Sequence, residues 1–143
     1  MFFSKLFKKK NTPAATPKVN VSHLPALNEW AIFFQGNGIV LYSRFAGTIQ
    51  NTDKSLIYLK SYPEVFELER KQFAEWLTTS STGVYLQQWD KDAWSLVFIS
   101  FTDPKLTVIK TGIKIALWET GYENGKPAIF FKDSGTVEVL VIN

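Results

Sequence analysis

The sequence predicts an α+β fold, in which a twisted, mainly antiparallel β-sheet carries one principal α-helix at about residues 64–79. Three observations favour this class. Short apolar and β-branched runs alternate with turn-forming residues, a helical period follows Pro63, and roughly 120 residues beyond the N-terminal segment suffice for a single core. We therefore expect residues 19–143 to form one globular domain.

Residues 1–18 differ from the remainder in charge. Residues 1–10 are basic and amphipathic, and residues 11–18 contain two prolines typical of a linker. Five of the 16 basic residues and no acidic residue lie in this segment, so residues 19–143 hold 11 basic and 13 acidic side chains and carry a charge of −2. The pI of about 9.1 therefore reflects the N-terminal segment. Nucleic-acid binding is not expected, because it depends on clustered basic residues on the domain.

The first predicted elements are strands at residues 30–34 and 39–42. They flank Gly36, Asn37 and Gly38, which supply the positive φ that a hairpin turn needs. A helix over residues 24–34 is the alternative, because Leu27, Trp30, Ala31 and Phe34 also share a helical face. A further short strand is predicted at residues 55–59.

A second hairpin is predicted from residues 84–89 and 94–101, which a loop of turn-forming composition separates at residues 90–93. The second of these strands is apolar on both faces, which is typical of a central strand covered from both sides. Turn signals at residues 124–125 and 133–135 help to delimit the later predicted strands, at residues 105–110, 113–118, 128–131 and 136–142.

The predicted helix follows from the spacing of apolar residues after Pro63. A rotation of about 100° per residue places six apolar side chains within half of the circumference, namely Val65, Phe66, Leu68, Phe73, Trp76 and Leu77. Glu69 falls near the middle of this apolar arc. Either Glu69 is a functional carboxylate, or the helix begins nearer Glu69 and its dipole favours an acid in the first turn. The second interpretation is favoured.

Catalytic and metal chemistry find little support in the sequence. The chain has no Cys and one His, so it lacks a thiol nucleophile, a disulfide framework and a zinc site, and no cofactor is predicted. His23 lies beside the linker and is expected at the surface. Three local pairs of carboxylates lack a partner base or a metal-ligand spacing, so an enzyme is not predicted: Glu64 and Glu67, Asp90 and Asp92, and Glu119 and Glu123.

Aromatic residues carry more information, because the chain has 12 Phe, 5 Trp and 5 Tyr. Trp89 and Trp94 flank the second hairpin loop symmetrically and are expected to face each other across the strands. The pair either closes the hairpin or forms, with Asp90 and Asp92, an acidic-rimmed anchor for a partner protein, since Trp is enriched at binding hot spots. These four residues are the predicted partner-binding site.

The N-terminal segment suggests a membrane alternative. In a helix, its apolar side chains fall on one side and its lysines mostly on the other, an arrangement that binds anionic membranes reversibly. The residues concerned are Phe2, Phe3, Lys5, Leu6, Phe7, Lys8, Lys9 and Lys10. Apolar stretches fall far short of a bilayer span and no secretory signal is recognised, so a cytoplasmic location is expected.

The opening residues MFFSKLFKKK, followed by a Pro-containing spacer and a compact aromatic-rich domain without catalytic residues, resemble bacterial immunity proteins. These include proteins paired with contact-dependent growth-inhibition toxins. The resemblance lies in size and type and assigns no functional residue. It implies a non-enzymatic cytoplasmic protein that binds a cognate toxin domain and blocks its active site. A peripheral membrane protein and a small carboxylate-dependent enzyme are the alternatives.

Overall fold

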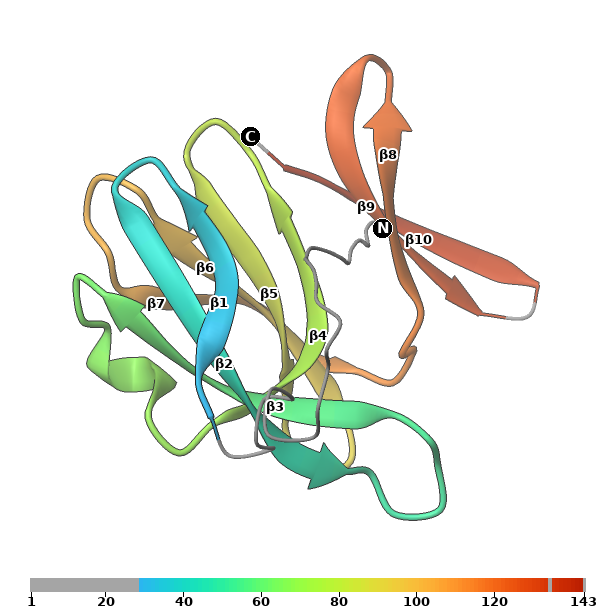
Figure 1. The fold of residues 1–143 in the computed structure, drawn as a ribbon. Helices are drawn as coiled ribbons and strands as arrows, with labels where there is room; N and C mark the ends of the chain where they lie inside the picture. Colours follow the sequence, from blue (N-terminus) through green and yellow to red (C-terminus); the bar gives the residue numbers. More distant parts are fainter. Residues whose placement is uncertain (1–28, 134, 143) are drawn as a thin grey trace, which may run out of the picture.

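A computed structural model describes residues 29–133 and 135–142 of the chain. Within these ranges the chain forms ten β-strands in two antiparallel sheets (Figure 1). The seven-stranded sheet follows chain order, with β1 Ala31–Gly36, β2 Ile39–Thr48, β3 Ser55–Tyr62, β4 Gln72–Thr79, β5 Gly83–Trp89, β6 Trp94–Ser100 and β7 Leu106–Ile113. The three-stranded sheet has the order β10-β9-β8, with β8 Trp118–Glu123, β9 Lys126–Asp133 and β10 Thr136–Val141.

The predicted α+β class is wrong, because the described chain is 65% strand and 3% helical and has no helix of seven or more residues. The segment predicted as a helix at about residues 64–79 instead forms a 3-10 turn, η2 (Phe66–Leu68), followed by β4. Arg70 has a φ of +66°, a left-handed conformation in which an α-helix cannot continue. Glu69 caps the end of the turn and is exposed, so it is neither a buried carboxylate nor a first-turn acid.

Both predicted hairpins are confirmed. β1 and β2 pair around Asn37 and Gly38, which both adopt positive φ, so the described part of the helical alternative is wrong. β5 and β6 pair in continuous register, and Trp89 lies opposite Trp94 with 4.7 Å between ring centroids.

The strand predicted at residues 113–118 is wrong. Ile113 ends β7, residues 114–117 form no regular structure, and Trp118 begins β8. The indole Nε1 of Trp118 donates a hydrogen bond to the carbonyl of Ile115 (2.7 Å), which satisfies a backbone group where the chain leaves one sheet for the other.

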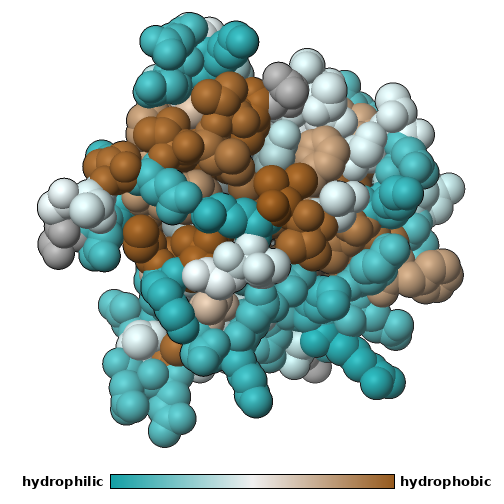
Figure 2. All heavy atoms as spheres, turned by 180° about the vertical axis from the view of Figure 1, so that it is seen from behind, coloured by the Kyte–Doolittle hydropathy of each residue, from teal (hydrophilic) through white to brown (hydrophobic). Residues whose placement is uncertain are grey.

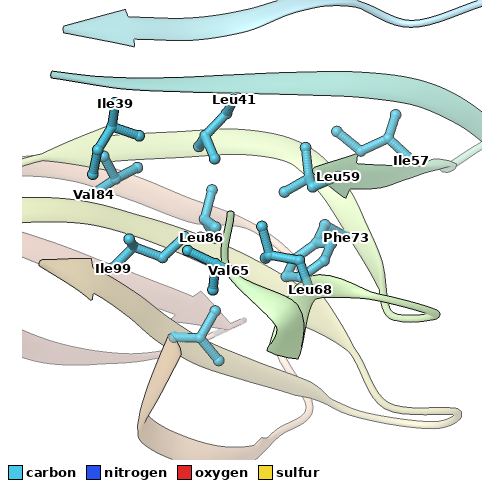
Figure 3. Packing of buried hydrophobic residues seen from close by; sticks show 11 residues of the cluster. Ile39, Leu41, Ile57, Leu59, Val65, Leu68, Phe73, Val84, Leu86 and Ile99 are labelled. Carbon is cyan, nitrogen blue, oxygen red and sulfur yellow. The ribbon is translucent and has the colours of Figure 1, made fainter. Parts of the chain in front are cut away.

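The first core lies inside the curled seven-stranded sheet. Figure 3 shows side chains of β2 and β3 pointing toward those of β5 and β6, with Val65 and Leu68 of the connection between β3 and β4 entering the same space. Fully burying one such aliphatic side chain contributes roughly 1.5–3 kcal/mol relative to leaving it exposed. The buried members are Ile39, Leu41, Ile57, Leu59, Val65, Leu68, Phe73, Val84, Leu86, Val97 and Ile99.

The second core lies between β4–β6 and the three-stranded sheet. The Trp118 ring packs edge-on against Trp76 and Phe131, with centroids 5.2 and 5.0 Å apart. Tyr85 and Leu96 join this core from β5 and β6. β6 is therefore covered on both faces, as its apolar sequence predicted. The three-stranded sheet does not cover most of the outer face of β1–β3.

No helical segment of the described chain is long and apolar enough to cross a bilayer.

Candidate functional site

The pairing of the seven-stranded sheet is interrupted between β3 and β4. β2 pairs with β3 along the whole length of β3, whereas β4 pairs with β3 only at Leu56 and Ile57. Residues 58–62 thus have β2 on one side and no paired strand of the described chain on the other. The connection between β3 and β4 begins with a cis peptide bond at Pro63 and crosses this region through η2.

A groove runs along this open strand edge. The cavity measures about 660 Å³ and is lined by all five of residues 58–62, with residues from the β3–β4 connection on its other side. Successive side chains of a strand point to opposite faces of the sheet. A cavity that borders all five residues therefore lies along the edge of β3, where backbone N–H and C=O groups are within reach of a ligand.

One wall of the groove combines aromatic rings with cations. Arg44 lies opposite Tyr58 in the β2–β3 register, and its guanidinium carbon is 4.9 Å from the ring centroid of Trp30 and 5.4 Å from that of Tyr58. Lys60 lies opposite Tyr42, with its Nζ 4.5 Å from the Trp30 centroid and 6.0 Å from the Tyr42 centroid. These are cation–π distances, so the rings hold both cations in place.

The cations of this wall keep capacity for an anionic ligand. The salt bridges between described side chains involve neither Arg44 nor Lys60. An aromatic face attracts a cation without neutralising its charge, so both groups can still donate hydrogen bonds to a carboxylate.

The other wall is mixed in character. On this side Phe66 of η2 is 71% exposed; at the end of the strand side, Tyr62 of β3 is 72% exposed. Glu64, Glu69 and Arg70 also line this side of the cavity. The groove thus has one basic-aromatic wall, a second wall with both charge signs, and apolar rings at its rim.

The structure brings together Trp89, Asp90, Asp92 and Trp94, the predicted partner-binding residues, at the tip of the β5–β6 hairpin. Trp94 is only 2% exposed, within the second core, and Trp89 is half-buried. The carboxylate of Asp90 accepts hydrogen bonds from Gln88 Nε2 (2.6 Å) and from the Ser95 hydroxyl. Trp94 and Asp90 are therefore engaged within the hairpin, and Asp92 remains exposed.

The other predicted site residues are dispersed or lie elsewhere. Glu119 forms a salt bridge with Lys132 (2.7 Å), and Glu64 lines the groove whereas Glu67 does not. No cluster of three or more potential metal ligands is found in the described ranges. His23 and the predicted membrane-contacting residues at positions 2–10 lie outside the described residues.

Sequence reasoning missed the basic-aromatic wall, although a signal was present. Tyr42 and Arg44 are two residues apart, and so are Tyr58 and Lys60. In a strand this spacing puts each aromatic and its cation on the same face. The register that sets Arg44 opposite Tyr58 and Tyr42 opposite Lys60 then joins the two pairs into one basic-aromatic surface.

No protein family, curated protein or solved structure matches this chain. The chemistry of the groove itself is therefore the basis for a functional proposal.

Proposed function

We propose that this chain is a non-enzymatic protein-binding module that captures an extended, acidic segment of a partner protein along the open edge of β3. The supporting observation is the cavity that borders all five of residues 58–62. An extended peptide at an open edge forms main-chain hydrogen bonds as an added strand, and its alternate side chains enter the flanking pockets.

Charge and ring placement select the partner. Arg44 and Lys60 both lie on the Trp30 side of the groove. Side chains of an added strand alternate in direction, so every second residue of the bound segment faces these cations. We expect carboxylates at those positions, because charge-assisted hydrogen bonds to a carboxylate are stronger than neutral ones. Apolar side chains of the segment pack against Tyr62 and Phe66 at the rim.

The most specific form of this proposal is a cytoplasmic immunity protein that neutralises a bacterial toxin domain. Support comes from the resemblance in size and type and from a groove suited to a protein segment. Residues 19–143 carry a net charge of −2, whereas the basic-aromatic wall of the groove, with Arg44 and Lys60, is positive. A toxin would therefore be recognised through an acidic segment at this wall, where opposite charge also speeds association.

A peptide titration tests the coarser proposal. The probe is a synthetic peptide that alternates Glu with Val, compared with the same peptide carrying Lys in place of Glu, and binding is followed by NMR on the isotope-labelled full chain. We expect the acidic peptide to shift the backbone amide signals of residues 58–62 and the Lys peptide to leave them unchanged. Stronger binding of an oligodeoxythymidine than of the acidic peptide would instead assign the rings and cations to nucleic acid and overturn the proposal.

Charge reversal identifies the wall that binds. Lys60→Glu should weaken the affinity for the acidic peptide at least about tenfold, which corresponds to about 1.4 kcal/mol of binding free energy. Lys114→Glu is the matched control, because Lys114 is an exposed lysine that does not line the groove. Equal effects of the two variants would show that only net charge matters and would contradict a site at β3.

The toxin form needs a cellular test. Cells expressing the product of the neighbouring gene should be protected by this chain and not by its Lys60→Glu variant, and the two wild-type proteins should copurify. Copurification that survives Lys60→Glu would place the interface outside the groove. Absence of both protection and a complex would remove the toxin form.

A further inference from the structure

β10 is an edge strand without the usual protection against pairing. It is the outer strand of the three-stranded sheet, and its sequence TVEVLV contains no Lys and no Pro. Its register with β9 runs without a bulge. Val137, Val139 and Val141 are 56%, 37% and 44% exposed. Figure 2 shows apolar side chains gathered on the side of the molecule that carries the three-stranded sheet. Such an edge is a template for another strand.

One hydrogen bond shows which backbone N–H and C=O groups of β10 point toward β9 and which point toward the open edge. The N–H of Ile142 donates to the carbonyl of Pro127 (2.9 Å), directly after the last pair of the β9–β10 register, Val141 with Ala128. In an antiparallel pair, backbone groups point alternately toward and away from the partner strand. Counting back from Ile142, the N–H and C=O groups of Val141, Val139 and Val137 point away from β9, toward the open edge.

The one charge on this strand is already compensated. Glu138 accepts a salt bridge from Lys110 Nζ of β7 at 3.0 Å. Glu138 alternates with the valines, so its side chain leaves on the opposite face of the strand. Neither the open backbone groups nor the valine face therefore carries an uncompensated charge that would repel an incoming strand.

We propose that β10 pairs antiparallel with β10 of a second copy of this chain, which joins two three-stranded sheets into one sheet of six strands. In a register centred on Val139, this residue faces its own equivalent, and Val137 faces the partner's Val141. The residues in these facing pairs are the ones whose backbone groups point outward. Glu138 faces the partner's Leu140, so no like charges lie directly opposite each other.

The match of side chains in this register favours a second copy as the occupant: the exposed valines face valines, and Glu138, already paired with Lys110, faces Leu140 and not another acid. The pair of strands is related by a two-fold axis through Val139, as in an isologous dimer. The occupant differs from that proposed for β3, because β10 offers valines where the groove offers cations and rings. The inference therefore rests on different residues from those that support the proposed function.

A charge-swap experiment on the full chain tests this pairing. The oligomeric state is measured by sedimentation over a range of protein concentrations up to about 1 mM, since small interfaces are commonly weak. We expect the wild type to dimerise and Val139→Lys to dimerise at least about tenfold more weakly, because two like charges would face each other across the axis. Val139→Glu should behave in the same way. An equimolar mixture of the two variants should recover the dimer.

The recovery in the mixture separates this pairing from any other contact. A wild type that stays monomeric at all concentrations overturns the proposal, and so does a dimer that Val139→Lys leaves intact. Loss of the dimer in both variants without recovery in the mixture would contradict the register centred on Val139.

A backbone variant gives an independent readout. Val139→Pro removes an N–H that points to the open edge while leaving the bonds to β9 in place, and proline is tolerated at such edge positions. We expect Val139→Pro to weaken the dimer more than Val139→Thr, which keeps the N–H. Equal dimerisation of these two folded variants would contradict strand pairing. Circular dichroism confirms folding in each case.

Discussion

Among the strand edges of the described residues, those of β3 at residues 58–62 and of β10 differ in their surroundings. Residues 58–62 of β3 line a groove between the strand and the β3–β4 connection, beside Trp30, Arg44 and Lys60. β10 lies at the outside of the three-stranded sheet and offers three partly exposed valines. Both edges have backbone groups available for pairing. The side chains around each edge are the basis for the two different partners that we propose, an acidic segment for β3 and a second copy for β10.

The two edges also have different structural origins. At β3, pairing with β4 stops after two residue pairs, and η2 anchors the intervening connection in the first core through Leu68. At β10, the edge is simply the last position in a regular sheet. Changes in the first core should therefore affect the groove and leave the β10 edge intact, which allows the two proposals to be tested separately.

The largest effect is expected for Leu68→Ala. Leu68 is 1% exposed in the first core, and truncating a buried leucine to alanine typically costs about 2–5 kcal/mol of unfolding free energy. Acidic-peptide binding should also weaken, because η2 forms one wall of the groove, while dimerisation of the folded fraction should persist. Urea denaturation measures the first effect and peptide titration the second.

Phe66→Ala is the matched control, since Phe66 belongs to the same turn but is exposed at the groove rim. It should change the unfolding free energy by no more than about 0.5 kcal/mol, as is usual for a surface position. It should still weaken the binding of the acidic peptide. Comparable destabilisation by the two variants would show that the turn is not anchored through Leu68.

The next effect concerns the hairpin tip. Asp90→Ala leaves the hydroxyl of Ser95, a buried residue, without its acceptor and should cost roughly 1–3 kcal/mol. Asp92→Ala, at an exposed neighbour, should be nearly neutral. Thermal or urea unfolding measures both. A partner whose affinity falls equally in both variants, at unchanged stability, would instead assign binding to the tip.

The strands were predictable where turn chemistry and alternation agreed, as at residues 30–42 and 84–101. The segment after Pro63 was not, because its apolar residues satisfy a helical period while the chain forms a turn and then a strand. The deciding feature is the positive φ of Arg70, a residue type that gives no local signal for it. The β-branched Thr78 and Thr79 at the end of β4 did favour a strand.

The groove was harder to foresee than the fold. Its cations and rings come from β2, β3 and residue 30, and their proximity depends on the register that places Arg44 opposite Tyr58. Register is a tertiary property that one strand's sequence does not specify. The edge is open because β4 pairs with β3 only at Leu56 and Ile57. The sequence of residues 58–62 does not indicate that this pairing stops. The predicted pair of Trp89 and Trp94, by contrast, followed from the symmetry of one short loop.

Binding at the two edges should respond differently to salt. Raising the salt concentration from about 0.1 M to about 1 M shortens the Debye length from about 10 Å to about 3 Å, which screens Arg44 and Lys60. Acidic-peptide affinity should fall, whereas dimerisation through valines and backbone hydrogen bonds should not weaken. Titration and sedimentation at both salt concentrations measure this. A dimer that dissociates with salt would indicate an electrostatic interface and contradict pairing at β10.

The smallest effect is expected for Lys110→Gln. Lys110 and Glu138 have side-chain exposures of 37% and 57%, and a solvent-exposed ion pair contributes less than about 1 kcal/mol to folding. In the dimer, however, Glu138 would then face the partner's Leu140 without its compensating charge, so dimerisation should weaken more than stability does. Lys105→Gln, which removes the exposed pair with Asp103, is the control and should leave the dimer unchanged. Equal dimerisation constants for the two variants would show that Lys110 does not prepare β10 for pairing, and would leave the valines and the open backbone as its only determinants.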